Sequence, residues 1–231
     1  MSILKWIKSH FSKNVISYII IIITAIACAA LIKYCIRKKN GGPWRLSTVV
    51  YYIDDTVPFS VKYKIIEVMN EITEISEIKF RERNKVDVAY INIIYVENDM
   101  TQCTSIVGCH DSKQNVTLGS YCLENDGIKH ELMHAIGFVH EQSRPDRDDY
   151  ININYDNIEP SKRHNYDKQS NFVWDNIVEN TEYDLKSILH YSGVNTMSDK
   201  TGGIIKKNIN FSEGDVIKLK KYYKLYKDYT F

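Results

Sequence analysis

The chain has 231 residues and a formal net charge of +1, because its 30 lysines and arginines nearly balance its 29 aspartates and glutamates. This length favours one main domain plus an appendage. The balance of charge excludes a global attraction to nucleic acid or to an anionic membrane surface, so no nucleic-acid partner is expected.

The first predicted element is a helix over an uncharged, strongly apolar run, residues 15–32, which Lys13 and Lys33 bound. A helix of this length rises about 27 Å, close to the roughly 30 Å hydrocarbon core of a bilayer. We therefore expect residues 15–32 to form a transmembrane signal-anchor helix, after a short tail over residues 1–14 and before a linker over residues 33–43. A cleaved signal peptide is the alternative, because the small residues between positions 25 and 29 fit a small-x-small cleavage pattern.

The main domain is expected over residues 44–231, after the breaker cluster Asn40-Gly41-Gly42-Pro43. In its first half, strands are predicted over residues 49–53, 89–96 and, more briefly, 116–118. Apolar residues at helical spacing predict a helix over residues 60–75, with Ser60 as its N-cap.

The second half has few strand signals and many asparagines and aspartates, which predicts a loop-rich region. Near the C-terminus, residues 218–227 alternate lysine with leucine and tyrosine. This pattern favours a helix that buries leucine and tyrosine, with lysine facing water, over a nucleic-acid-binding patch.

Residues 130–134 read His-Glu-Leu-Met-His, the pattern HExxH. Residues four apart share one face of a helix, so His130 and His134 can direct their imidazole nitrogens at one zinc ion. Glu131 projects beside them, where its carboxylate can take a proton from a water molecule at the metal. Gly137 stands where a left-handed residue would end the helix, and this turn lets His140 return as a third ligand.

Residues 130–150 read HELMHAIGFVHEQSRPDRDDY, which resembles the extended zinc signature HExxHxxGxxHExxRxDRDxY of the astacin family of metzincin proteases. The resemblance covers nearly the whole domain. Residues 44–53 resemble the start of the mature astacin domain, residues 103–108 with Cys122 resemble its disulfide-linked loop, and residues 211–215 resemble the start of its C-terminal helix.

This resemblance implies an α+β fold with two metzincin-like lobes. The N-terminal lobe would contain a twisted mixed sheet, a long helix and the zinc helix. The C-terminal lobe would be loop-rich and would end in a terminal helix.

The resemblance also implies a zinc-dependent endopeptidase with one zinc ion per chain and protein or peptide substrates. His130, His134 and His140 would be the metal ligands, and Glu131 would be the catalytic base. An extended substrate would pair with a sheet edge just upstream of the zinc helix. The alternative is a catalytically silent, zinc-stabilised adhesion or interaction module, against which Glu131 argues because a structural zinc site needs no base.

Residues 187–191, Ser-Ile-Leu-His-Tyr, resemble the Met-turn SxMHY of the same family. By this resemblance, Tyr191 is a catalytic residue and an additional zinc ligand at rest, and its phenol swings away to stabilise the oxyanion. Leu189 stands where the family has methionine. Because leucine and methionine are similar in volume and hydrophobicity, we expect this difference to reduce stability at most.

The chain has five cysteines, and the resemblance pairs Cys103 with Cys122 in a disulfide. The second disulfide of the family is absent, because Glu77 stands at one of its positions and no cysteine follows Cys122. Cys109 is left either as a free thiol or linked to a partner.

The family also inserts a freed N-terminal ammonium group near the glutamate that follows the third histidine, here Glu141. An anchored chain would have no free terminus nearby, so this contact is not carried over.

Two features predict the location of the catalytic domain. The expected disulfide would persist in an oxidising compartment, and Asn115 and Asn210 each begin an N-glycosylation sequon. We therefore expect a single-pass membrane protein, attached through residues 15–32, with a lumenal or extracellular catalytic domain. Cleavage of the signal would instead give a secreted enzyme.

Overall fold

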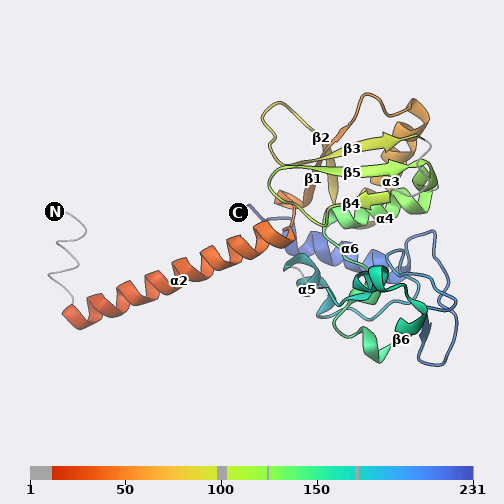
Figure 1. Cartoon of the computed structure of the whole chain (residues 1–231). Coiled ribbons are helices and arrows are strands. Elements are labelled where there is room, and N and C mark those ends of the chain that lie inside the picture. Colours follow the sequence, from red (N-terminus) through yellow and green to blue (C-terminus); the bar gives the residue numbers. More distant parts are fainter. Residues whose placement is uncertain (1–11, 98–102, 124, 170–171, 231) are drawn as a thin grey trace. The chain divides into compact units, whose positions relative to one another are not determined.

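The structure is a computed structural model that describes residues 12–97, 103–123, 125–169 and 172–230. The chain divides into two compact units, Met1–Lys39 and Asn40–Phe231. Figure 1 shows the elements of both units.

The described part of the first unit is a long helix, α2 (Lys13–Asn40). It forms over the predicted apolar run and continues through most of residues 33–43. The predicted linker over residues 33–43 is thus helical as far as residue 40, because neither glycine nor proline interrupts the helix there. Among the described residues, no helix is both long and apolar enough to cross a membrane. The predicted transmembrane helix is not supported.

The second unit begins with a mixed, five-stranded sheet in the order β2-β1-β3-β5-β4. Four strands run parallel, and β4 pairs antiparallel with β5 at one edge. The strands are β1 (Thr48–Ile53), β2 (Lys79–Glu82), β3 (Tyr90–Val96), β4 (Cys103–Ser105) and β5 (Lys113–Gly119). The predicted strands correspond to β1, β3 and a part of β5. The sequence did not reveal β2 and β4, because both are short and polar and lie at the edges of the sheet.

Two helices pack on this sheet, α3 (Phe59–Ser76) and α4 (Asn125–Ile136). α3 confirms the predicted helix, but its N-cap is Pro58 and makes no side-chain capping bond, so the prediction of Ser60 as the cap is wrong. Ser60 lies in the first turn, because the chain turns into the helix directly after the extended Pro58. The helix buries one face, formed by Val61, Ile65, Val68, Met69 and Ile72.

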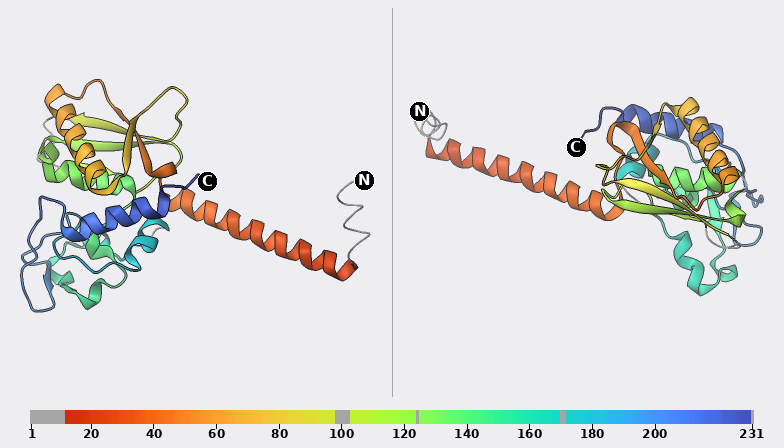
Figure 2. Two further views of the ribbon diagram at one scale, coloured as in Figure 1. Left: turned by 180° about the vertical axis from the view of Figure 1, so that it is seen from behind. Right: turned by 90° about the horizontal axis from the view of Figure 1, so that it is seen from above.

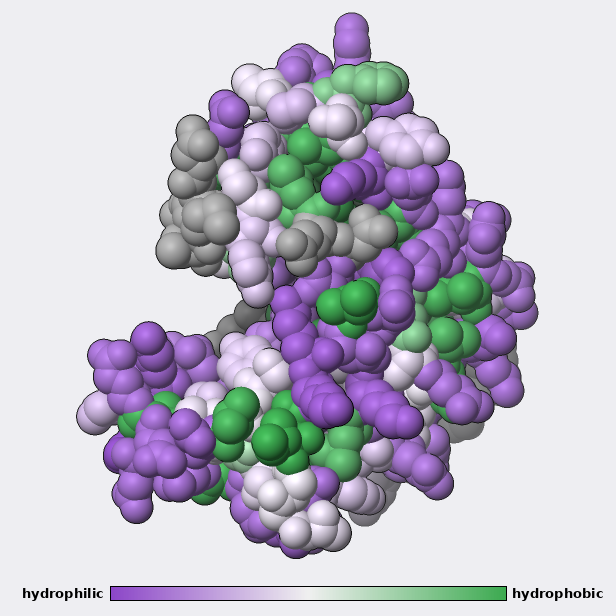
Figure 3. Space-filling view, turned by 90° about the vertical axis from the view of Figure 1, so that its right-hand side faces the viewer, coloured by the Kyte–Doolittle hydropathy of each residue, from purple (hydrophilic) through white to green (hydrophobic). Residues whose placement is uncertain are grey.

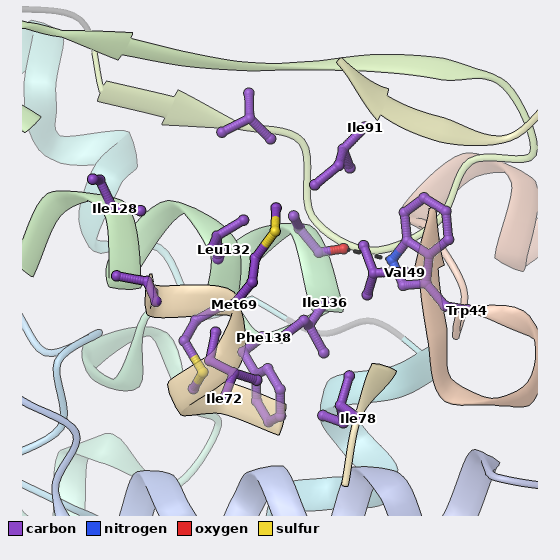
Figure 4. Packing of buried hydrophobic residues seen from close by; sticks show 14 of the residues in the cluster. Trp44, Val49, Met69, Ile72, Ile78, Ile91, Ile128, Leu132, Ile136 and Phe138 are labelled. Atoms are coloured by element: carbon purple, nitrogen blue, oxygen red, sulfur yellow. Dashed lines mark hydrogen bonds between the residues drawn. The ribbon is translucent and has the colours of Figure 1, made fainter. Parts of the chain in front are cut away.

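The main core lies between the sheet and these two helices. Figure 4 shows side chains from α3, α4, β1 and β3 in one cluster; those labelled include Met69, Ile72, Ile128, Leu132, Ile136, Val49 and Ile91. Trp44 is buried at its edge, and its indole Nε1 donates a hydrogen bond to Ala135 O at 2.8 Å. The start of the domain is thereby attached to α4, the helix that carries the HExxH motif.

The second lobe is rich in loops, as expected. It contains α5 (Phe172–Val178), a two-stranded antiparallel ribbon of β6 (Ile151–Ile153) and β7 (Met197–Asp199), and the terminal helix α6 (Glu213–Tyr226). A smaller core of its own holds Ile151, Ile158, Tyr166, Tyr183, Met197 and Ile205. Figure 2 shows this lobe beside the sheet lobe, and α6 contacts both α3 and α5. The arrangement confirms the predicted two-lobed α+β fold.

A disulfide joins Cys103 of β4 to Cys122, which lies in the turn just before α4. This bond fixes the edge strand of the sheet to the beginning of α4. Cys109 is buried in the main core with 2% exposure.

Candidate active site

The end of α4 determines where the third histidine lies. Gly137 has a φ of +136°, and the amides of Gly137 and Phe138 both donate to Met133 O, at 3.2 and 3.1 Å. A Cβ at position 137 would lie 2.9 Å from Val173 Cγ1 of α5. Both the backbone conformation and this close approach therefore favour glycine. Beyond this turn the chain reverses and brings His140 back to the helix.

The three predicted metal ligands lie together. Nε2 of His130 is 3.0 Å from Nε2 of His134 and 3.2 Å from Nε2 of His140, and the third side of the triangle is 3.3 Å. A tetrahedral zinc ion with Zn–N distances near 2.0–2.1 Å separates its ligand nitrogens by about 3.3 Å. The triangle therefore has the size that a single zinc ion needs.

Hydrogen bonds on the far side of the rings indicate which nitrogen carries the proton. Nδ1 of His130 lies 2.9 Å from Ile188 O, and Nδ1 of His134 lies 2.7 Å from Phe138 O. A carbonyl oxygen only accepts, so Nδ1 is protonated in both rings and Nε2 presents its lone pair to the triangle. Converging lone pairs repel one another unless a cation lies between them. The donor set therefore fits a divalent metal ion.

Burial also favours neutral rings at this site. It is the largest cause that lowers the pKa of His134 to about 3, with a further contribution from His130. Burial likewise lowers the pKa of His130 and of His140. Neutral imidazole is the form that binds a metal ion.

Glu131 lies beside the histidines with 3% exposure, and its Oε2 atom has no hydrogen-bond partner among the residues that the structure describes. Burial raises the pKa of Glu131 to about 8. A carboxyl group with a pKa near neutrality can both accept and donate a proton, and its unpartnered oxygen can bind a water molecule or an amine.

Tyr191 packs against the third histidine. Its ring centroid lies 4.5 Å from that of His140, with the planes inclined at 62°. Burial is the main cause that raises the pKa of Tyr191, so the phenol keeps its proton near neutral pH and can donate a hydrogen bond. Leu189, two residues earlier, is fully buried in the main core.

The segment over residues 187–191 is attached to the terminal helix by one carboxylate. Asp215 accepts from Ser187 Oγ at 2.6 Å and from Ile188 N at 2.8 Å. The same carboxylate completes a capping box with Ser212 at the start of α6. Because Ile188 O faces Nδ1 of His130, Asp215 also orients that ring indirectly.

The three histidines, Glu131 and Tyr191 line a cleft of about 390 Å³, together with residues of β4 and with Lys207 and Asn208. Figure 3 shows the surface hollowed between the two lobes. Lys207 Nζ forms an ion pair with Asp126 Oδ2 at 2.5 Å within this lining. Sequence reasoning missed this pair, since no local pattern marks two residues so far apart in the chain. It also missed the role of Asp215, which the capping-box spacing from Ser212 signals.

Comparisons with known proteins agree with this geometry. The family model described as Astacin, a peptidase family, matches residues 36–224. Zinc metalloproteinase nas-13 of Caenorhabditis elegans is 35% identical over 190 residues, which are 78% of this chain and 40% of the relative. Zinc metalloproteinase nas-6 of the same organism is 37% identical over 197 residues, 80% of this chain and 55% of the relative. The chain thus spans about half of the length of these relatives, or less.

A solved structure is similar as well. High choriolytic enzyme 1, a hatching enzyme zinc-protease from Oryzias latipes (medaka fish), superposes with a TM-score of 0.69 at 26% identity. The match covers 80% of this chain and 94% of that one. The similarity therefore extends over both lobes and the cleft between them.

The turn at Gly137 generates a prediction about stability. Replacing Gly137 with alanine should lower the free energy of unfolding by about 2–4 kcal/mol, because a Cβ there meets Val173 and the backbone conformation is strained for an L-residue. Gly202→Ala is the matched control, since Gly202 has a φ of +87° but open space around it, and should cost only about 1 kcal/mol. Denaturant unfolding of both variants measures the difference. Equal losses would contradict the contribution of the contact with α5.

Proposed function

The chain belongs to the astacin family of zinc metalloproteases, and we propose that its main domain, residues 44–231, is a zinc-dependent endopeptidase. It would hydrolyse peptide bonds in protein or peptide substrates. The observation that carries the proposal is the convergence of three imidazoles beside a buried carboxylate, one oxygen of which has no hydrogen-bond partner among the described residues.

We propose that one zinc ion per chain is held by the Nε2 atoms of His130, His134 and His140. When bound, the ion would supply Lewis-acid chemistry at the centre of the triangle, where it polarises a water molecule and the substrate carbonyl. The Nδ1 hydrogen bonds to Ile188 O and Phe138 O support this assignment, because they hold two rings in the tautomer and the direction that a metal requires.

Glu131 is proposed as the general base and then the general acid. Its Oε2 atom would accept a proton from the attacking water and deliver it to the nitrogen of the leaving amine as the peptide bond breaks. The raised pKa of Glu131 supports both steps, because the group can carry the proton near neutral pH. A structural zinc site has no use for such a group, so the alternative of a silent adhesion or interaction module is not favoured.

Tyr191 is proposed to stabilise the oxyanion of the tetrahedral intermediate by donating a hydrogen bond from its phenol. Its contact with His140 and its raised pKa support this role, because the hydroxyl stays protonated next to the ligand set. The additional role of Tyr191 as a ligand in the resting enzyme is part of the same proposal.

The substrate is proposed to lie extended along β4. Among the described residues this strand pairs with β5 alone, and all three residues of β4 line the cleft. A peptide added antiparallel or parallel to such an edge gains main-chain hydrogen bonds that do not depend on its sequence. We further propose that the domain works in a lumenal or extracellular compartment, which the Cys103–Cys122 disulfide supports.

The metal content tests the proposal first. The purified full chain, dialysed against metal-free buffer, should retain one equivalent of zinc by metal analysis, and its cleavage of casein or gelatin should stop when a chelator removes the zinc. His134→Ala should lose the metal, because only two of the three ligands remain. A folded wild-type protein with well under half an equivalent of zinc would argue against the site.

The proposed base is tested by Glu131→Gln. This variant should keep the zinc and the melting temperature but lose roughly 10²–10⁴-fold in kcat, because the amide cannot take the proton while the ligands are unchanged. Glu67→Gln on the exposed face of α3 is the matched control and should keep full activity. Substantial cleavage by Glu131→Gln would rule out this role.

The proposed oxyanion donor is tested by Tyr191→Phe. Its kcat should fall by roughly 10²–10³-fold with a smaller change in KM, because the phenol acts on charge that develops only in the transition state. Tyr150→Phe, which alters an exposed ring, serves as the control. An unchanged kcat in steady-state kinetics would mean that Tyr191 is only structural.

A further inference from the structure

A buried ion pair includes the residue that follows His140, the third histidine. Lys218 Nζ of α6 donates to Glu141 Oε2 at 2.6 Å, and the side chains of Lys218 and Glu141 are 1% and 0% exposed. Glu141 is the residue that follows His140. The pair therefore connects the terminal helix to the main chain next to a proposed zinc ligand.

Glu141 also makes other contacts that fix this part of the chain. Its Oε1 atom accepts from Asp184 N at 3.0 Å and from Arg144 Nη1 at 3.3 Å. Its backbone amide donates to Leu189 O at 3.1 Å. One residue thus joins the segment after His140 to the loop that carries Tyr191. A movement of Glu141 would therefore displace both His140 and this loop.

Arg144 is not the main counter-ion of Glu141. Its guanidinium makes two shorter hydrogen bonds to the carboxylate of Asp146, at 2.8 and 2.7 Å. The positive charge of Arg144 is therefore shared with Asp146, and the ammonium of Lys218 is the closest cation to Glu141. A buried carboxylate that loses its counter-ion is strongly destabilised and moves toward water or a new partner.

We propose that Lys218 is a positioning residue of the zinc centre. Its ammonium holds the Glu141 carboxylate in place. Through Glu141 it keeps the imidazole of His140 close to those of the two histidines of α4. This inference rests on the proposed zinc site. The competing interpretation is that Lys218 only fills space in the core, where its Nζ lies 5.9 Å from the ring centroid of Trp174.

The decisive variant is Lys218→Met, which keeps an unbranched side chain of similar length and removes the charge. Chelator competition at a temperature where the full chain stays folded should give a zinc dissociation constant roughly 10–100-fold weaker than wild type, the range typical of groups that orient metal ligands. Lys221→Met is the matched control. Lys221 lies on the same helix and donates to the backbone carbonyl of Ile177, so its loss should leave zinc affinity unchanged.

Two further variants separate charge from packing. Lys218→Arg keeps the positive charge and should recover most of the zinc affinity. The double variant Glu141→Gln with Lys218→Met removes both charges and should be more stable than Lys218→Met alone. Should Lys218→Met fail to fold, this double variant decides the matter: recovery of folding supports the proposal, and failure to fold shows a packing role and overturns it.

Zinc affinity equal to wild type in folded Lys218→Met would also overturn the proposal, as would an equal loss in Lys221→Met. Failure of the proposed function looks different, because the wild-type chain itself would then bind no zinc.

Discussion

The lone pairs of three imidazole nitrogens point at one another across distances of at most 3.3 Å. Without a cation this arrangement is repulsive, because the lone pairs face one another at short range. The domain must therefore hold the three rings together against the repulsion between their lone pairs. It does so by giving two of the Nδ1 atoms a backbone carbonyl, one from the residue four positions on in the chain and one from the second lobe.

The supports for this arrangement come from distant parts of the chain. Gly137 allows the reversal that returns the third histidine to α4, and Asp215 binds the segment that orients the first. Glu141, the residue after His140, is hydrogen-bonded to Lys218 of the terminal helix. Among the described residues, α6 contributes none to the cleft lining. It is nevertheless hydrogen-bonded to Ile188, which contacts His130, and to Glu141, which follows His140. Residues of both lobes therefore support the proposed metal site.

The pair between Lys218 and Glu141 also bears on a difference from the family. The family resemblance expects a freed N-terminal ammonium near this glutamate, whereas here a lysine within the same domain lies 2.6 Å from its carboxylate. A buried carboxylate needs a nearby positive charge, and the origin of that charge is not dictated by the chemistry. In this chain Lys218 supplies a positive charge at that position.

Local patterns in the sequence determined the core of the site. The spacing HExxHxxGxxH predicts the ligands because helical periodicity and a glycine turn act within eleven residues, and the same short-range rules predict α3, β1 and β3. The edge strand β4, the ion pair of Lys207 with Asp126, and the contacts of Asp215 and Lys218 were decided only by the tertiary structure. Each joins residues far apart in the chain, and their polar side chains carry no periodic signal. The apolar run before the domain predicts a helix for the same local reason, but a hydrophobic pattern alone did not establish how far that helix extends, because helix ends depend on where breakers occur.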